Sequence, residues 1–248
     1  AARAYGRAVY GPFDSVVAPS QAMCRHLEHW GLRHVSCQPL GVDTAVFHPG
    51  CASRPWRTRM GWSDRTRLLV FAGRFAPEKH LDVLAAAVDR LGPPYALLAI
   101  GAGPAPPRGD RVRCLPFIAA EPGLAVALAS ADAFVHAGDQ ETFGLSALEA
   151  LACGTPVVLR DSEGLADWVD ERVGVGVPSG GAGAFAEAVA ALFDDRRQPL
   201  PQRRLAARQR ALAHDWAQVF PQMLARYRRL LHGAAAAGFE PAGTRAAR

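Results

Sequence analysis

The hydrophobic residues between positions 68 and 177 alternate between continuous runs and helical spacings. Residues 68–72 are an unbroken apolar run, and the segment after it repeats apolar residues on one helical face, at Leu81, Leu84, Ala85, Val88 and Leu91. Further strands are predicted at 96–100, 112–117, 133–137, 156–159 and 173–177, and helices at 124–131 and 143–152. Strands that are apolar throughout are buried on both faces. The pattern predicts an α/β fold with a doubly wound parallel sheet.

The first fifty residues predict the end of a second, partial Rossmann-like unit. Strands are expected at 15–18 and 35–40, around a helix at 21–30 that Ser20 begins. Turn residues at 41–44 and 48–50 then interrupt the pattern, and a polar, arginine-rich stretch reaches Arg67. We therefore expect a domain boundary between 44 and 67.

This boundary divides the chain into three predicted segments. Residues 1–50 would close an N-terminal domain and form a hinge, residues 51–232 would form one domain, and residues 233–248 would be a disordered tail. The last two strands are each followed by a helical stretch. A final amphipathic helix covers 216–231, and Pro221 should kink it or mark its first turn.

Because the chain begins with Ala1 rather than Met, and residues 1–10 show neither a cap nor clear periodicity, we expect further sequence upstream.

The amino-acid composition indicates in which cellular compartment the protein is expected. Hydrophobic residues make up 50% of the 248 residues and charged residues 21%, as in soluble globular proteins. No apolar run reaches the roughly 18 residues of a membrane-spanning helix. The five cysteines are dispersed without a C-x-x-C pair, which argues against a disulfide framework and against a zinc site. We expect a cytoplasmic protein with no metal site.

The net charge of +5 has its main source late in the chain. The arginines concerned are Arg196, Arg197, Arg203, Arg204, Arg208, Arg210, Arg226, Arg228 and Arg229. Such a set is typical of a solvated helical face, and a membrane surface or a nucleic acid are the alternatives. Aromatic residues do not interleave with these arginines, so we expect no nucleic-acid partner. A peripheral contact with the inner face of a membrane stays open.

One residue is compositionally unusual. Lys79 is the only lysine among the 28 basic residues of the chain. A chain that uses arginine almost everywhere else indicates a need for a compact ammonium at this position, although one position could hold lysine by chance.

Lys79 closes the first of two candidate motifs, at residues 73–79 (Gly-Arg-Phe-Ala-Pro-Glu-Lys). The motif follows the first strand of the predicted sheet, at the edge where open α/β sheets bind ligands. Arg74 and Lys79 could both reach a diphosphate, the arginine as a fork and the lysine as a point charge. The alternative is that both are surface charges on a strand–helix loop.

The second motif spans residues 139–158, between a buried strand and a helix. Glu141 precedes the helix, and the backbone N–H groups of Phe143, Gly144 and Leu145 would point at an anionic or sugar ligand above the helix start. Glu149 lies two turns along, within reach of a different part of that ligand. The alternative is that Glu141 caps the helix and Glu149 is an exposed helical residue.

Together the motifs resemble family 4 of the retaining glycosyltransferases, which have the GT-B fold. That family combines a G-R-x4-K turn with E-x-F-G-x4-E-A-x-A-x-G-x-P-V-V, and every fixed position of both patterns is present, at 73–79 and 141–158. The hinge region of the family is similar to residues 18–20, 39–43, Phe47 and Pro49. The resemblance covers roughly residues 15–232.

The resemblance implies transfer of a hexosyl group from a UDP- or GDP-hexose to a sugar, lipid or other alcohol acceptor, with retention of configuration. Arg74 and Lys79 would stabilise the departing diphosphate, so that neither a metal nor a cofactor is expected. Glu141 would act on the transferred sugar, and Glu149 would bind the ribose. No protein nucleophile is implied.

The sequence departs from the family pattern in three places. His80 replaces the usual Gly after the lysine, and Ala137–Gly138 replace the usual Pro-Ser before the glutamate. The acceptor-binding domain of the family is not found, and none of the eight histidines matches the one that the family places near the reacting sugar. This chain alone is therefore expected to be incomplete.

Two further sequence patterns give only weak evidence of a binding site. Gly101 and Gly103 follow a strand without the third glycine of a dinucleotide fingerprint. Asp161 and Glu163 imitate a metal site, but they lie at the start of a predicted helix, where capping is expected.

Three functions remain at this point. The leading one is the glycosyltransferase. The second is a donor-binding module that is inactive alone because the acceptor domain is missing or lies in another chain. The third, weaker one is a nucleotide-dependent oxidoreductase.

Overall fold

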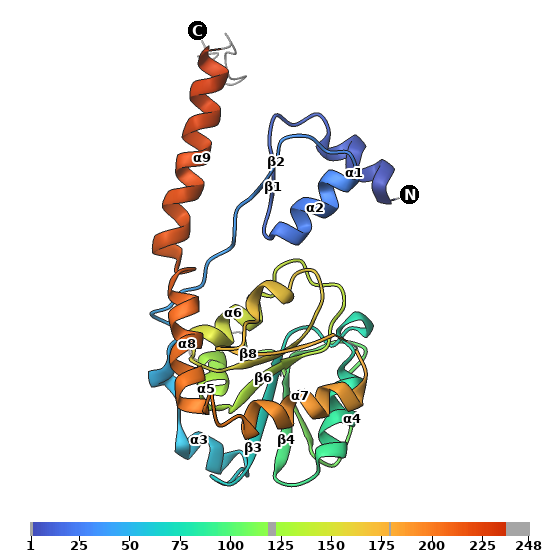
Figure 1. The fold of residues 1–248 in the computed structure, drawn as a ribbon, viewed down its shortest axis with the longest axis vertical. Helices are drawn as coiled ribbons and strands as arrows, with labels where there is room; N and C mark the ends of the chain where they lie inside the picture. Colours follow the sequence, from blue (N-terminus) through green and yellow to red (C-terminus); the bar gives the residue numbers. More distant parts are fainter. Residues whose placement is uncertain (1, 119–122, 179, 237–248) are drawn as a thin grey trace.

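Six parallel strands form the sheet of the larger part of the molecule. In the computed structural model, which describes residues 2–118, 123–178 and 180–236, their order across the sheet is β5-β4-β3-β6-β7-β8 (Figure 1). The strands are β3 (Arg67–Ala72), β4 (Tyr95–Ile100), β5 (Val112–Leu115), β6 (Ala133–His136), β7 (Val157–Arg160) and β8 (Gly174–Val177). Successive strands are laid down outward from β3 on one side and from β6 on the other. This is the doubly wound arrangement that the sequence predicted, and its order reverses between β3 and β6.

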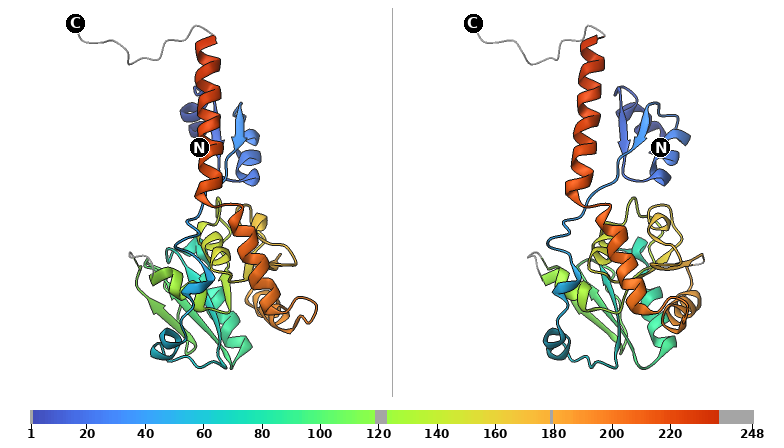
Figure 2. Two further views of the ribbon diagram at one scale, coloured as in Figure 1. Left: turned by 90° about the vertical axis from the view of Figure 1, so that its left-hand side faces the viewer. Right: turned by 60° about the vertical axis from the view of Figure 1, so that its left-hand side comes forward.

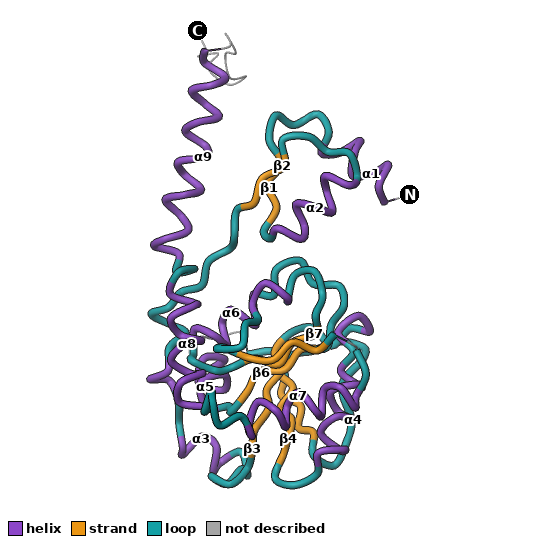
Figure 3. Tube along the Cα trace, viewed as in Figure 1, coloured by secondary structure: helices purple, strands orange, loops and turns teal. Residues whose placement is uncertain are grey.

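Helices cover both faces of this sheet (Figure 3). One face packs against α4 (Leu81–Leu91) and α7 (Ala182–Asp194). The other packs against α5 (Gly123–Ser130), α6 (Leu145–Ala152) and α8 (Leu200–Leu212). The central strands are therefore mainly apolar, with Leu68 and Leu97 fully buried.

A smaller N-terminal unit stands apart from this domain (Figures 1 and 2). It contains α1 (Ala2–Tyr10), β1 (Val16–Ala18), α2 (Gln21–His29) and β2 (Val35–Cys37), and its two strands pair in parallel. Ser20 caps α2 as predicted, since its side chain accepts a hydrogen bond from the amide of Met23 at 3.2 Å. Helix α1 was not predicted. It lacks a sequence signal because Gly6 packs directly onto the ring of Trp30, a contact that is not local in sequence.

The predicted hinge at 41–44 is held by the segment that joins α8 to α9 (Trp216–Ala236). The amide of Val42 donates to the carbonyl of His214, and the amide of Trp216 donates back to the carbonyl of Val42. The side chain of Asp215 accepts from both the amide and the hydroxyl of Thr44. The chain therefore crosses between the two parts twice, and the two crossings are hydrogen-bonded to each other.

Several predicted elements differ in extent. The stretch before Arg67 contains the 3₁₀ helix η1 (Pro49–Cys51) and the short helix α3 (Arg54–Arg59), which Ser53 caps. The helix expected after β7 is reduced to the 3₁₀ helix η3 (Ala166–Trp168). Helix α9 contains Pro221 and continues to Ala236, past the expected boundary at 232. The rest of the expected tail, residues 237–248, lies outside the described residues. No helix in the described ranges is both long enough and apolar enough to cross a membrane.

The apolar stripe of α9 is largely uncovered in this structure. Val219 is buried, but Phe220, Tyr227 and Leu231 are exposed, and α9 extends beside the N-terminal unit (Figure 2). Arg226 on α9 donates to the hydroxyl of Ser36 and to the carbonyl of Cys37, which fixes the helix against β2.

The arginines of α8 are structural, which corrects the interpretation as a solvated face for these members of the set, whereas Arg196, Arg197, Arg228 and Arg229 are exposed as expected. Arg208 donates to three carbonyls, of Thr44, Phe47 and Ala152, so it joins the hinge to α6. Arg204 donates to the carbonyl of Ala131 at 2.7 Å. The guanidinium groups donate hydrogen bonds to backbone carbonyls that would otherwise lack a donor when they are buried.

Arg203 is the most buried of these arginines, at 3% exposure. It donates to the carbonyls of Glu171 and Gln198 and pairs with Asp195. We expect Arg203→Ala to lower the free energy of unfolding by about 2–4 kcal/mol, because two part-buried carbonyls lose their donor and Asp195 loses its buried partner. Arg197→Ala, on the exposed loop before α8, is the control and should change stability by less than about 0.5 kcal/mol. Chemical denaturation of the two variants measures the difference, and equal midpoints would refute the structural assignment.

Candidate active site

Two loops meet where the strand order of the sheet reverses. The first follows β3 and contains the 3₁₀ helix η2 (Pro77–Lys79), and the second connects β6 to α6. The amide of Asp139 donates to the carbonyl of Glu78 at 3.3 Å and joins the two loops. The two sequence motifs, whose key residues are 62 positions apart, are thus brought to one edge of the sheet.

Lys79 and Glu141 form an ion pair at this edge. The Nζ atom of Lys79 donates to Oε2 of Glu141 at 2.6 Å. Lys79 ends η2 and is only 8% exposed, so its ammonium is directed into the protein rather than into solvent. A buried ammonium needs a counter-charge, and Glu141 supplies it. The only lysine of the chain therefore lies in a site that requires a compact cation.

The charge of Glu141 is strongly favoured. Burial by itself would raise the pKa of this carboxyl, but the contacts with His136 and Lys79 outweigh burial and lower the pKa from 4.5 to about 2. Glu141 is ionised throughout the physiological range as a result.

His136 is the third member of this cluster and lies outside both sequence motifs. It ends β6, is 1% exposed, and places Nε2 3.5 Å from Oε2 of Glu141. Burial lowers the pKa of its imidazole, and the charge of Lys79 lowers it further. A histidine at the end of an otherwise apolar strand, five positions before a motif glutamate, was the available signal.

His80 explains how the turn tolerates the loss of the usual glycine. Its backbone has φ 49° and ψ 48°, the left-handed conformation that glycine adopts most readily. The turn is therefore shaped as a glycine would shape it. The imidazole Nε2 lies 3.0 Å from the Asp139 carboxylate, and this contact holds the pKa of that carboxyl below its usual range.

The start of α6 presents backbone N–H groups. The helix begins at Leu145, with Gly144 as its N-cap at φ 82°, about two residues later than predicted. The amides of Ala147 and Leu148 donate to the carbonyl of Gly144, so the N–H groups of Gly144, Leu145 and Ser146 lie before these first intrahelical donors. The side chain of Phe143 is buried edge-on against Trp168, whose indole N–H donates to the carbonyl of Phe143.

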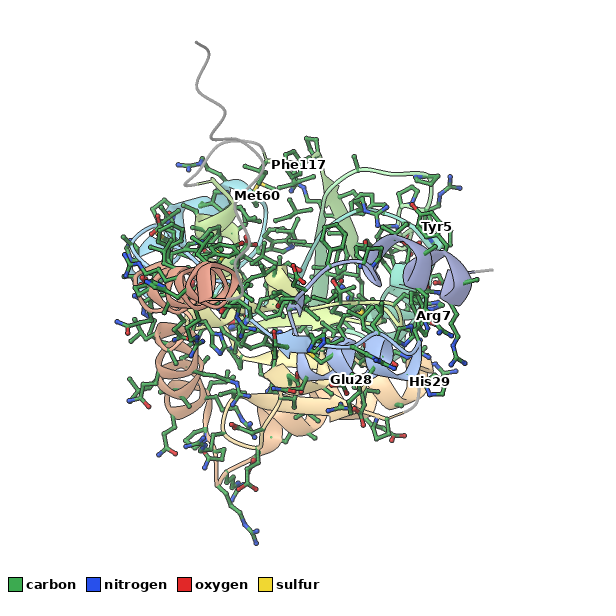
Figure 4. The ribbon with its side chains drawn as sticks, turned by 90° about the horizontal axis from the view of Figure 1, so that it is seen from above. Tyr5, Arg7, Glu28, His29, Met60 and Phe117 are labelled. Carbon is green, nitrogen blue, oxygen red and sulfur yellow. The ribbon has the colours of Figure 1, made fainter. Side chains whose placement is uncertain are left out.

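A cavity of about 400 Å³ opens beside this cluster. Glu141 and Glu149 both line it, as do Leu145 and Ser146 of α6. The remaining lining residues are Phe47, Ala72, Gly73, Ile100, Phe117, Ile118 and Leu124. Phe117 is exposed, and it lies at the periphery of the molecule seen from above (Figure 4). The cavity has an apolar wall and a few convergent polar groups, the usual composition of a small-molecule site.

Arg74 lies on the same loop as Lys79 but is not part of the buried cluster. Its side chain is exposed and its guanidinium contacts Glu78 at 3.2 Å. An exposed pair of this kind is weak, so Arg74 can exchange Glu78 for another anion at little cost.

The two weaker sequence signals have structural explanations. A Cβ on Gly101 would lie 1.9 Å from the carbonyl oxygen of Gly73, and a Cβ on Gly103 would lie 2.3 Å from that of Phe75. These glycines therefore allow the loops after β3 and β4 to pack. Asp161 and Glu163 do not begin an α-helix as predicted, since only η3 follows them.

Comparison with known proteins shows to which family the chain belongs. A sequence model of the family described as "Glycosyl transferases group 1" matches residues 66–195, which include both loops. The chain belongs to this family. The predicted resemblance to the retaining glycosyltransferases of family 4 and the predicted fold class are confirmed.

Individual relatives extend the match. The chain is 36% identical over 224 residues to a GDP-mannose-dependent alpha-(1-6)-phosphatidylinositol dimannoside mannosyltransferase of Mycobacterium tuberculosis, covering 86% of this chain and 57% of the relative. It is 34% identical to a GDP-mannose-dependent alpha-mannosyltransferase of the same species, covering 92% of this chain and 60% of the relative. The chain thus spans 57% to 60% of the length of these relatives.

A solved structure is similar over the same extent. Sucrose-phosphate synthase from Thermosynechococcus elongatus superimposes with a TM-score of 0.82 at 27% identity, covering 93% of this chain and 62% of that structure.

The ion pair predicts how Glu141 titrates. Its carboxyl should remain ionised down to about pH 2 in the wild type, and in Lys79→Met its pKa should rise because the neighbouring charge is lost. Since the folded-state pKa lies below 4.5, the stability that Glu141 contributes is present above that value and is lost as the pH falls from 4.5 to about 2. Carboxyl NMR titration of both proteins measures this, and an unchanged Glu141 pKa in Lys79→Met would contradict it.

Proposed function

We propose that this protein is a retaining hexosyltransferase, which moves a hexosyl group from a nucleoside diphosphate sugar to an alcohol acceptor without a metal ion. The observation that carries the proposal is the Lys79–Glu141 pair beside a cavity that also contains the start of α6 and Glu149. Membership of the glycosyltransferase family supports the same conclusion.

The proposed site divides the donor between its groups. The diphosphate lies against Lys79 and the N–H groups at the start of α6, where the helix dipole favours negative charge. Arg74 leaves Glu78 and adds a second cation as the diphosphate departs. Together these groups neutralise the charge that develops on the leaving group, which is the task that a metal ion performs elsewhere.

The two glutamates act on different parts of the donor. Glu141 is ionised and lies near the sugar, so it stabilises the positive charge that forms at the anomeric carbon in the transition state. Glu149 lies one helical turn into α6 and binds the ribose hydroxyls. On the mechanism that the family resemblance implies, the acceptor oxygen enters on the face that the diphosphate leaves, so configuration is retained without a protein nucleophile.

GDP-mannose is the donor that we propose first, because the names of the mannosyltransferase relatives specify it. The same names suggest a mannosylated or inositol-containing acceptor, and a lipid-linked acceptor would bring the protein to the inner face of a membrane.

Calorimetry tests donor binding and metal independence together. The chain should bind GDP-mannose or UDP-glucose equally well with and without EDTA, because Lys79, Arg74 and the α6 amides supply the positive field. Loss of binding on chelation would overturn the metal-independent mechanism.

Transfer needs a separate measurement on the protein encoded by the complete gene. The anomeric ¹H coupling of the glycoside product reports retention or inversion. Donor binding without transfer to any alcohol would support the alternative of a donor-binding module.

Substitution of the two glutamates separates their functions. Glu141→Gln should lower kcat by about 10- to 1000-fold while affinity for free GDP stays nearly unchanged, because an interaction made mainly in the transition state appears in kcat. Glu149→Gln should instead weaken binding of GDP, with a smaller loss of rate at saturating donor.

Each glutamate variant is the matched control for the other, since both changes remove one carboxylate from the same cavity. Steady-state rates and GDP calorimetry on both proteins give the comparison. The opposite result, with affinity lost in Glu141→Gln and turnover lost in Glu149→Gln, would reverse the assignment.

A further inference from the structure

His136 is held in one orientation by its surroundings. Its ring packs between the rings of Phe71 and Phe134, with centroid distances of 5.2 and 6.4 Å. Its Nδ1 atom lies 3.0 Å from the amide nitrogen of Gly138. A backbone amide can only donate, so Nδ1 must be the acceptor. The neutral ring therefore carries its proton on Nε2, the atom that faces Glu141.

Gly138 is the partner that makes this orientation sterically feasible. A Cβ at position 138 would lie 2.5 Å from Cε1 of His136 and 3.2 Å from the carbonyl oxygen of Glu78. Any residue larger than glycine would therefore push the imidazole away from its place. The departure from the usual Pro-Ser at positions 137 and 138 is thus tied to the histidine at 136.

Lys79 and His136 approach the same oxygen of Glu141, at 2.6 and 3.5 Å. If Lys79 turns toward a diphosphate, as the proposed function requires, Glu141 loses its shorter contact. His136 then remains beside Oε2, and such hydrogen bonds commonly shorten in the complex with substrate.

We propose that His136 is a positioning residue, which holds Glu141 ionised and directed at the transferred sugar through its Nε2–H while Lys79 is engaged with the donor diphosphate. This inference rests on the proposed function. It gives a function to a residue that lies outside both sequence motifs.

The charged groups around the imidazole are consistent with a neutral donor. Lys79 on η2 and Glu141 on the loop after β6 are the charged side chains that contribute to its titration, and Phe71 of β3 contributes only its ring. Burial and the lysine both disfavour the imidazolium. His136 is therefore neutral at physiological pH and donates one hydrogen bond rather than a charge.

Two amide substitutions separate the functions of the two ring nitrogens. In His136→Gln the side-chain amide reaches the position of Nε2 and can donate to Glu141. In His136→Asn the shorter side chain reaches only the position of Nδ1, so it can accept from Gly138 but cannot reach Glu141. Both replacement side chains are polar, and neither is much larger than the imidazole. The two variants are therefore a matched pair.

We expect His136→Asn to lower kcat about 10- to 100-fold, the effect of losing a hydrogen bond to a charged group, while affinity for GDP changes by less than about twofold. His136→Gln should retain kcat within about threefold. The acid limb of the kcat profile should move to higher pH in His136→Asn, because Glu141 loses a donor that favours its charged form. Kinetics are measured on the protein encoded by the complete gene, with thermal unfolding of each variant alongside.

Wild-type protein provides a measurement that does not depend on the folding of a variant. Long-range ¹H–¹⁵N NMR of this chain should show His136 as a neutral imidazole protonated on Nε2. A proton on Nδ1, or equal kcat and pH profiles in the Asn and Gln variants, would overturn the inference while leaving the proposed function intact. A wild-type protein that binds no nucleoside diphosphate sugar would instead refute the proposed function, and this inference with it.

Discussion

The buried contact between the Lys79 ammonium and the Glu141 carboxylate is the constraint on which the site depends. Neither group is stable alone at this depth, so the loops after β3 and β6 must close on each other for either charge to be accommodated. This requirement accounts for the left-handed backbone at His80, which turns the chain so that Lys79 points inward. It also explains why the ammonium and the carboxylate lie in direct contact, with Nζ and Oε2 2.6 Å apart.

The N-terminal unit is coupled to the same loop. Ser20 begins α2 and also donates from its hydroxyl to the carbonyl of Thr142 at 2.8 Å, one residue beyond Glu141. The hinge crossings at 41–44 and 214–216 hold this unit near the sheet, and Arg208 connects the hinge to the end of α6. A displacement of the N-terminal unit would therefore reach the loop that carries Glu141 through these hydrogen bonds.

The sequence predicted a helix or strand correctly wherever a single periodicity or a local capping residue was enough to define it. The strand series, the Ser20 cap and the meeting of both motifs at one sheet edge were all predicted, because parallel strands and short loops leave few alternatives. Contacts between distant segments were not predictable. The carbonyls that Arg203 and Arg208 satisfy, and the ring of Trp30 that supports α1, belong to segments far away in sequence. His136 was missed for the same reason, since its importance comes from Glu141 and Gly138 folding back onto it.

The solitary lysine has a practical consequence for studying the molecule. A reagent that acylates primary amines can modify only Lys79 and the chain terminus, since every other basic side chain is a guanidinium or an imidazole. Because Nζ is buried and paired with Glu141, acylation at this one position requires the amine to leave that pair and become accessible. Lys79 can therefore report on the accessibility of the site without any introduced label.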